Sequence, residues 1–249
     1  AYLGEKSRRM QQQRKNMERR QARAIQEKKK LLKNVETVES LKLFPLSYHS
    51  QRLVVLEQVS ACYGNPPIPV SEPVTMEIRN GDRICLRGKN GCGKSSLFRL
   101  ILGEQIEEAG KIWRGSGLKI SYVSQDTSHL RGSLREYARA FQVEEHLICA
   151  LLRKLDFSRE QLEKPLEALS QGQKKKVLIA RSLCEQAHLY LWDEPLNYVD
   201  VYSRIQIEEL ILKFQPTMVF VEHDAEFADR VADRILMMNP AAGRSQIRY

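Results

Sequence analysis

Apolar residues are sparse and regularly spaced in the first part of the chain. From Leu3 to Val38 they recur every seven residues in an otherwise polar stretch, and no proline or glycine interrupts the segment between Lys6 and Phe44. Such a narrow stripe predicts a long helix that packs along one seam against another helix. A solvated helix face or a disordered tail is the alternative for this segment.

After Pro45 the pattern changes to short apolar runs separated by helical stretches. Strand-type runs occupy residues 52–63, 74–79, 83–87, 119–124, 188–194 and 217–224. Helical spacing follows residue 94 and recurs at 134–155 and 173–184. Helices that alternate with buried strands predict an α/β fold with a parallel sheet covered on both faces. Asn80-Gly81 predicts a hairpin turn between two of the strands, and we expect Trp113 in the core.

Charge divides the chain in the same way. Residues 1–33 contain 12 Lys or Arg and 3 Glu, whereas the other 28 basic and 28 acidic residues cancel. The first segment therefore carries the whole net charge of +9, which suits a polyanionic partner such as RNA. The five cysteines lie far apart, so neither a zinc site nor a disulfide framework is predicted. No apolar run reaches the ~20 residues of a membrane span, and these features together favour the cytoplasm.

The sequence GKNGCGKSS, residues 88–96, places glycines, a lysine and serines between an apolar strand and a helix. Its spacing is that of a phosphate-binding P-loop, in which glycines let consecutive backbone N–H groups surround an anion at a helix N-terminus. Lys94 would reach the β and γ phosphates of a nucleoside triphosphate, and Ser95 would bind Mg²⁺. A solvated turn is the alternative. The predicted nucleotide contacts in this loop are Asn90, Gly91, Cys92, Gly93, Lys94, Ser95 and Ser96.

Two adjacent carboxylates end the apolar run at 188–194. Asp193 is predicted to hold the metal ion through water, and Glu194 to act as the general base toward an attacking water. A solvated loop start is the alternative. Together with the P-loop, this pair predicts hydrolysis of a nucleoside triphosphate with Mg²⁺.

The order of the P-loop, Gln125, LSQGQ at 169–173, WDEP at 192–195, Asp200 and His223 resembles that of the ATP-binding-cassette (ABC) ATPases. The resemblance implies ATP as the nucleotide. It also implies a P-loop core that carries an antiparallel β subdomain and a small helical subdomain. In that family the glutamine matched by Gln125 contacts Mg²⁺ and the lytic water, and the histidine matched by His223 contacts the γ-phosphate.

Further site residues follow from the same resemblance. Tyr63 lies where the family places an aromatic residue that stacks on adenine, and a packing tyrosine is the alternative. Cassettes of this family pair head to tail. The resemblance therefore implies that Ser170, Gly172 and Gln173 act on a nucleotide bound to a partner cassette, and that full ATPase activity needs that partner.

More specifically, the chain from about Leu3 to Met238 resembles the carboxy-terminal half of an ABC-F protein, in which a basic helical hairpin joins two cassettes. Residues 1–44 would form one leg of that hairpin, and residues 51–240 the second cassette. The resemblance implies a first cassette outside this chain and the ribosome, through its RNA, as a partner. We therefore expect the chain to be a fragment of a longer protein.

The sequences LSQGQKKKVLIARSL and WDEPLNYVDV are similar to those of the antibiotic-resistance branch, whose members protect ribosomes against lincosamides, pleuromutilins and streptogramin A. The usual family residues Thr, His, Leu, Gly and Ser are replaced by Leu196, Tyr198, Val199, Gln171 and Glu222. These departures leave the residues assigned to ATP hydrolysis intact.

Two other functions compete with this interpretation. A nucleotide-binding subunit of an ABC transporter would dock on membrane helices and has no reason to begin with a basic helix. A DNA-repair or chromosome ATPase would carry its coiled coil inside the cassette, whereas the basic segment here precedes the cassette.

Overall fold

A five-stranded parallel sheet forms the base of the candidate site. The computed structural model describes residues 45–241, so the predicted helix at 1–44 lies outside the described residues. The strands follow the spatial order β6 (Ile120–Val123), β7 (Leu189–Asp193), β8 (Met218–Val221), β4 (Arg83–Arg87) and β9 (Arg234–Met237). All neighbouring strands pair in parallel. The predicted parallel sheet is thus confirmed, and every residue of β7 and β8 is buried.

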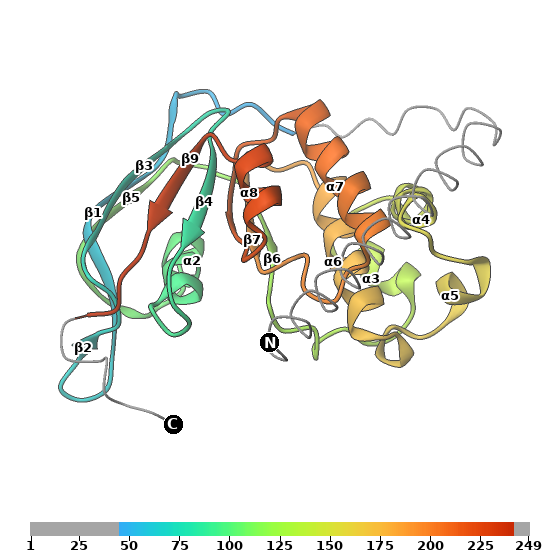
Figure 1. The fold of residues 1–249 in the computed structure, drawn as a ribbon, viewed down its shortest axis with the longest axis horizontal. Coiled ribbons are helices and arrows are strands. Elements are labelled where there is room, and N and C mark those ends of the chain that lie inside the picture. The colour runs from blue at the N-terminus through green and yellow to red at the C-terminus, as the bar shows by residue number, and fades with distance from the viewer. Residues whose placement is uncertain (1–44, 242–249) are drawn as a thin grey trace, which may run out of the picture. The chain divides into compact units, whose positions relative to one another are not determined.

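In a second sheet, which is antiparallel, one long strand pairs with all the others. β1 (Arg52–Tyr63) pairs with β2 (Ile68–Pro69), β3 (Val74–Arg79) and β5 (Glu107–Arg114). These strands lie at the left of Figure 1, and the parallel strands β6, β7 and β8 lie nearer its middle. Buried residues alternate with more exposed ones along β3, as in a sheet with one face against a core and the other in water.

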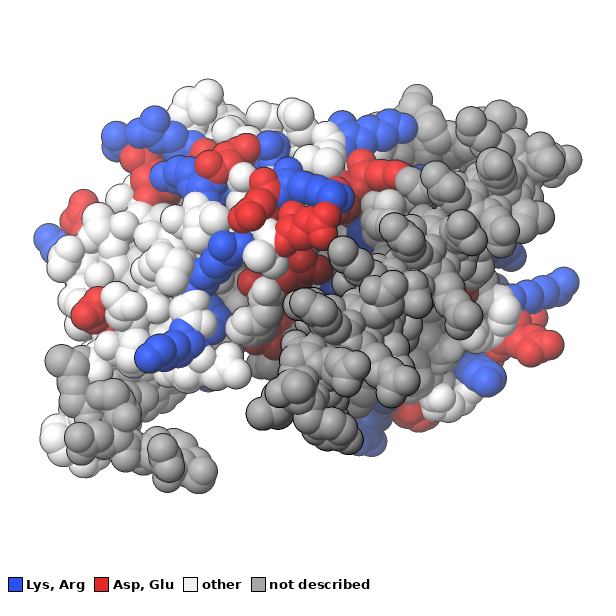
Figure 2. Space-filling view, in the orientation of Figure 1, with Lys and Arg blue, Asp and Glu red and all other residues white. Residues whose placement is uncertain are grey.

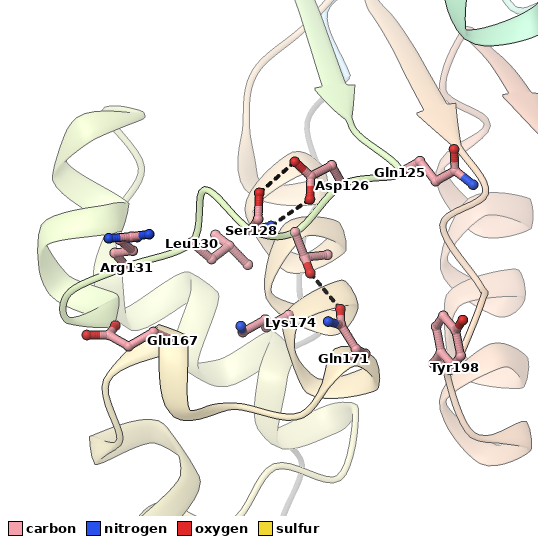
Figure 3. Close-up of a pocket in the computed structure, with 10 residues that line it drawn as sticks. Gln125, Asp126, Ser128, Leu130, Arg131, Glu167, Gln171, Lys174 and Tyr198 are labelled. Atoms are coloured by element: carbon pink, nitrogen blue, oxygen red, sulfur yellow. Dashed lines mark hydrogen bonds between the residues drawn. The ribbon is translucent and has the colours of Figure 1, made fainter.

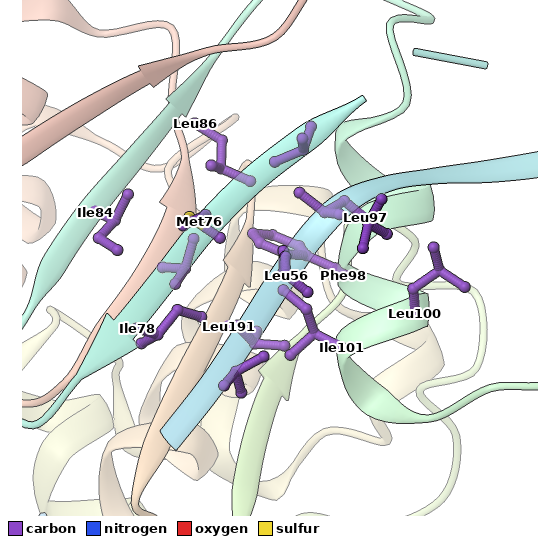
Figure 4. Packing of buried hydrophobic residues seen from close by; sticks show 14 of the residues in the cluster. Leu56, Met76, Ile78, Ile84, Leu86, Leu97, Phe98, Leu100, Ile101 and Leu191 are labelled. Carbon is purple, nitrogen blue, oxygen red and sulfur yellow. The ribbon is translucent and has the colours of Figure 1, made fainter. Parts of the chain in front are cut away.

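Helix α2 (Lys94–Leu102) packs into the core that the two sheets share. Its apolar residues Leu97, Phe98, Leu100 and Ile101 are at most 2% exposed. Figure 4 shows them beside Leu56 of β1, Met76 and Ile78 of β3, Ile84 and Leu86 of β4, and Leu191 of β7. The helix that begins at the P-loop lysine is therefore fixed by apolar contacts to both sheets.

The other helices extend from the parallel sheet. They are α3 (Leu134–Ala140), α4 (Glu145–Lys154), α5 (Arg159–Glu163), α6 (Gln171–Cys184), α7 (Val201–Phe214), α8 (Ala225–Val231) and the short 3₁₀ helix η1 (Leu166–Ala168). Helices α3 to α6 gather at the right of Figure 1. Ser133, Ser158 and Ser170 begin α3, α5 and α6 with capping boxes, because a Glu or Gln follows each serine three residues later. Between residues 45 and 241, no helix is long and apolar enough to cross a membrane.

The predicted hairpin at Asn80-Gly81 is wrong. The turn itself forms, with Gly81 at a φ of 86° and the Asp82 N–H donating to the Arg79 carbonyl over 3.1 Å. The strands on either side then diverge, since β3 stays beside β1 while β4 pairs with β8 and β9. The buried central residues of β4 favour a position inside the parallel sheet over a hairpin edge.

One smaller expectation also fails. Trp113 is 49% exposed on β5 and does not lie in the core. The helical stretch expected at 134–155 is confirmed and consists of two helices, α3 and α4. The chain leaves helical geometry between them, where Gln142 adopts a left-handed φ of 55°.

Candidate functional site

The P-loop connects β4 to α2. Gly91 and Gly93 have φ values of 78° and 94°, in the left-handed region that glycine adopts at little cost. A Cβ atom on Gly93 would lie 2.8 Å from Cγ2 of Val70, so the close approach of these two segments also requires glycine. Gly93 is the N-cap of α2 and has no side chain to occupy the first N–H groups of the helix. This geometry suits a phosphate group.

Lys94 folds back over the P-loop. Its Nζ atom donates hydrogen bonds to the carbonyl oxygens of Gly88, over 2.9 Å, and Lys89, over 3.1 Å. The residue is only 7% exposed, and the buried Sγ atom of Cys92 lies 4.0 Å from its Nζ atom. The ammonium group is therefore held inside the loop, where it would meet the charge of a bound phosphate.

Asp193 ends β7 and is 2% exposed. Burial raises the pKa of its carboxyl group, while a hydrogen bond with Ser95 and the positive charges of Lys175 and Lys94 act in the opposite direction. Within residues 45–241, the Oδ2 atom of Asp193 is buried and has no hydrogen-bond partner. A buried carboxylate oxygen with free acceptor capacity next to a serine hydroxyl fits Mg²⁺, which prefers oxygen ligands and commonly binds through one or two carboxylates and substrate phosphates.

Glu194 is the centre of a polar cluster. Its Oε2 atom accepts hydrogen bonds from Gln125 Nε2, over 2.9 Å, and from Asn197 Nδ2, over 2.7 Å. Its Oε1 atom lies 3.1 Å from Nε2 of His223. The backbone of Glu194 has a φ of 49°, which non-glycine residues seldom adopt, and its N–H is held by the Val221 carbonyl over 3.1 Å. Such backbone strain is typical of functional sites.

Tyr63 lies at the end of β1 and is 36% exposed. Its hydroxyl group donates to Oγ of Ser96, over 3.1 Å, and accepts from Nη1 of Arg99, over 3.4 Å. The tyrosine is thus attached to the first turns of α2 and keeps part of its ring accessible. Stacking on adenine stays a prediction for this residue.

One pocket of about 620 Å³ brings most of the predicted residues together. Its lining consists of Tyr63, Val70, Asn90, Gly91, Gly93, Lys94, Ser95, Ser96, Gln125, Glu194, Asn197 and His223. Cys92 and Asp193 are buried beside the pocket, next to Lys94 and Ser95 respectively. Residues far apart in the sequence therefore form a single cavity that combines the P-loop with the carboxylate of Glu194.

Ser170, Gly172 and Gln173 are not among the residues that line this pocket. They lie at the start of α6, where the Ser170 Oγ atom accepts from the Gln173 N–H over 3.3 Å. A Cβ atom on Gly172 would collide with the carbonyl oxygen of Tyr198, so the glycine permits a close approach of α6 to that loop. Action of these three residues on another cassette's nucleotide stays a prediction.

A second pocket, of about 640 Å³, lies beside α6 and is shown in Figure 3. Its lining consists of residues 125–128, Leu130, Arg131, Glu167, Gln171, Lys174 and Tyr198. The Oγ1 atom of Thr127 donates to Oε1 of Gln171 over 2.6 Å. Gln125 lines both pockets, so the segment that begins with it connects Glu194 to the start of α6.

Sequence reasoning assigned no role to Asn197 or Lys175. Asn197 follows Glu194 by three residues, and this spacing is the only signal in the sequence that could have indicated their contact. Lys175 is 3% exposed and donates to the Ser124 carbonyl over 3.0 Å. Burial lowers the pKa of Lys175, and the carboxylates of Asp193 and Glu194 partly oppose that shift. The run of three adjacent lysines gave no sign that its second and third members would be buried.

Comparisons with known proteins agree with this site. Residues 71–197 match the family model described as ABC transporter. The chain is 30% identical over 202 residues to the ATP-binding protein Uup of Caulobacter vibrioides. The aligned segment covers 78% of this chain and 33% of that relative. The chain is also 30% identical over 184 residues to Uup of Escherichia coli (71% and 29%) and 28% identical over 188 residues to the putative ATP-binding protein YdiF of Bacillus subtilis (74% and 29%).

The chain spans a third or less of the length of these three relatives. The family model nevertheless covers just over half of the chain, including the P-loop and the two carboxylates of Asp193 and Glu194. The chain therefore belongs to the ABC transporter family, of which it carries the ATP-binding domain.

Proposed function

We propose that this chain binds ATP with Mg²⁺ and hydrolyses it to ADP and phosphate. The observation that carries the proposal is the position of the Glu194 carboxylate, which lines the same pocket as the P-loop and is held by Gln125, Asn197 and His223. A carboxylate fixed beside a phosphate-binding loop is placed to act as a general base toward a water molecule.

Each group has a distinct role in the proposed reaction. Glu194 accepts the proton of the water that attacks the γ-phosphate, and the two amide donors on its Oε2 atom fix the orientation of the carboxylate. Lys94 and the P-loop N–H groups bind the negative charge of the β and γ phosphates. Ser95, Gln125 and Asp193 would hold Mg²⁺, which would neutralise part of the charge of the phosphates. His223 is positioned by its contact with Glu194 to reach the γ-phosphate.

The chain alone is expected to hydrolyse ATP slowly, since Ser170 lies outside the pocket that contains Lys94. In a head-to-tail pair, the serine for this pocket comes from the other cassette. Addition of a first cassette in trans should therefore raise the rate of phosphate release. Phosphate release measured at several concentrations of the chain, with and without that cassette, tests this expectation. Rapid turnover that is independent of concentration and of the added cassette would contradict a composite site.

We further propose that the complete protein is of the ABC-F type and acts on the ribosome. The support is the distribution of charge, because the net excess of +9 resides in residues 1–33. The cassette face in Figure 2 instead shows acidic and basic side chains intermixed. Ion pairs such as Arg83–Asp233 and Arg234–Asp82 neutralise charge within the cassette. A polyanion such as ribosomal RNA would therefore be attracted mainly to the amino-terminal segment.

Reversal of charge in that segment tests the ribosome proposal. In the full-length protein, changing Arg14, Arg19, Arg20 and Arg23 to Glu should weaken ribosome binding and flatten its dependence on salt, since each phosphate contact contributes a log–log slope of about −0.7 to −0.9. Binding is measured by co-sedimentation with ribosomes at several salt concentrations. Release of a labelled lincosamide from the same ribosomes would test the more specific proposal of antibiotic protection.

A matched control reverses four exposed cationic residues of the helical region. These are Arg139, Lys154, Arg159 and Lys164. The control variant should bind ribosomes with nearly the salt dependence of the unchanged protein. Equal effects of the two variants, or none from the amino-terminal one, would contradict a specific role for residues 1–33.

A further inference from the structure

Glu222 is a buried carboxylate at the carboxyl end of β8. It is 4% exposed, and burial raises its pKa despite the hydrogen bonds that it accepts. Its Oε1 atom accepts from the backbone N–H of Leu196 over 2.7 Å, and its Oε2 atom accepts from the backbone N–H of His223 over 3.2 Å. One side chain thus connects the loop that follows Glu194 to the residue that faces Glu194.

Arg204 of α7 holds the same loop from its other side. Its guanidinium group donates to the carbonyl oxygens of Leu196 and Val199, each over 3.0 Å. It also pairs with Asp224 over 3.2 Å, two residues beyond Glu222. The N–H of Leu196 is therefore bound by Glu222, and its carbonyl oxygen is bound by Arg204. Arg204 in turn pairs with Asp224, so both attachments lead to residues 222–224.

This double attachment matters because of the backbone at Glu194. A left-handed conformation at a non-glycine residue persists only where surrounding contacts hold it. Leu196 is fully buried two residues later, so a hydrogen bond at its N–H limits how the intervening chain can move. A serine, the usual family residue in place of Glu222, has one short side-chain oxygen and could not provide the two separate acceptor atoms of a carboxylate.

We propose that Glu222 is a positioning residue for ATP hydrolysis, which fixes the loop after Glu194 to the backbone of His223 and so sets the 3.1 Å contact between the His223 ring and the Glu194 carboxylate. The inference rests on the proposed hydrolysis of ATP. Glu222 is not among the residues that line the pocket with Glu194, but it lines a smaller cavity of about 200 Å³ together with Lys94 and His223. Both of its carboxylate oxygens are bound to backbone N–H groups, so its effect on the reaction is exerted through Leu196 and His223.

The first test replaces Glu222 with Gln in the full-length protein. The amide retains the size of the side chain but keeps only one acceptor oxygen, so one backbone N–H loses its partner. We expect kcat for ATP to fall about tenfold while KM and the affinity for ATP change less than twofold. Arg204→Gln removes the opposite attachment and should give the same separation of kcat from KM, which provides a second variant should Glu222→Gln fold poorly.

A matched control is Glu185→Gln. Its half-buried carboxylate pairs with Arg181 over 2.8 Å and accepts from Ser121, at the other end of α6 from Ser170. This variant should lower the melting temperature without lowering kcat. Loss of kcat in all three variants in proportion to their loss of thermal stability would overturn the proposal, because the effect would then be one of stability alone.

A double-mutant cycle separates positioning from general damage. If Glu222 acts by placing His223, then Glu222→Gln should change the hydrolysis rate less than twofold when His223 is already Ala. Single-turnover hydrolysis of labelled ATP measures these low rates. A tenfold loss in both backgrounds would overturn the proposal. Unchanged kcat in Glu222→Gln and Arg204→Gln would also overturn it, whereas a complete protein that does not hydrolyse ATP would overturn the proposed function itself.

Discussion

Replacing Glu194 with Gln is expected to lower the turnover number for ATP in the complete protein by about 10²-fold or more, the usual contribution of a positioned general base. Gln has nearly the same shape and can still accept from Gln125 or Asn197 through its carbonyl oxygen. It cannot take up the proton of the attacking water. Nucleotide binding should therefore persist, and the protein should accumulate in an ATP-bound form. Steady-state phosphate release and equilibrium binding of labelled ATP measure the two effects separately.

The control for this change is Glu208→Gln. The Glu208 side chain is 16% exposed and pairs with Arg230, and that of Glu194 is similarly shielded at 13%. Glu208 lies on α7 and is not among the residues that line the pocket with the P-loop. The control should retain turnover within about twofold. Equal turnover in Glu194→Gln and the unchanged protein would remove Glu194 from the role of base.

Lys94→Ala should weaken binding of Mg-ATP by about 10- to 100-fold, since hydrogen bonds to charged groups contribute about 1.5–3 kcal/mol each. The change removes the cation that would meet the phosphates, and it also removes the link between the Gly88 and Lys89 carbonyls. Isothermal titration with ATP and Mg²⁺ gives the affinity directly.

Lys89→Ala is the matched control for this loss. Lys89 is exposed in the same loop, so the variant changes the net charge equally without removing a buried ammonium group. Its affinity for Mg-ATP should stay within a few-fold of the original. If Lys94→Ala and Lys89→Ala weaken binding equally, the effect is one of overall charge, and the specific contact of Lys94 with phosphate is wrong.

The local features of the site were predictable because each depends on a short, contiguous pattern. Glycines with positive φ at 91 and 93, a lysine at the start of a helix and a carboxylate at the end of a buried strand are all encoded within a few residues. The parallel sheet was predictable for a similar reason, since runs such as residues 189–192 are apolar on both faces.

Features that depend on contacts between distant segments were not predictable. The Asn80-Gly81 turn has hairpin chemistry, yet partners for β4 come from residues more than a hundred positions later. Trp113 has the large apolar side chain of a typical core residue, but it lies on a strand whose residues are largely exposed. Glu222 was recognised only as a departure from the usual sequence, because its two backbone partners are visible only in three dimensions.

Because α2 packs into the core shared by both sheets, binding of a ligand at the P-loop should also affect the stability of the whole domain. The first residue of this helix belongs to the P-loop, and its apolar residues fill the cluster that joins β1 and β3 to β4 and β7. A ligand that binds only the native arrangement stabilises every element that must unfold together with its site. Phosphate bound at one end of α2 would therefore slow amide hydrogen exchange in the antiparallel sheet, although that sheet supplies only Tyr63 to the pocket lining.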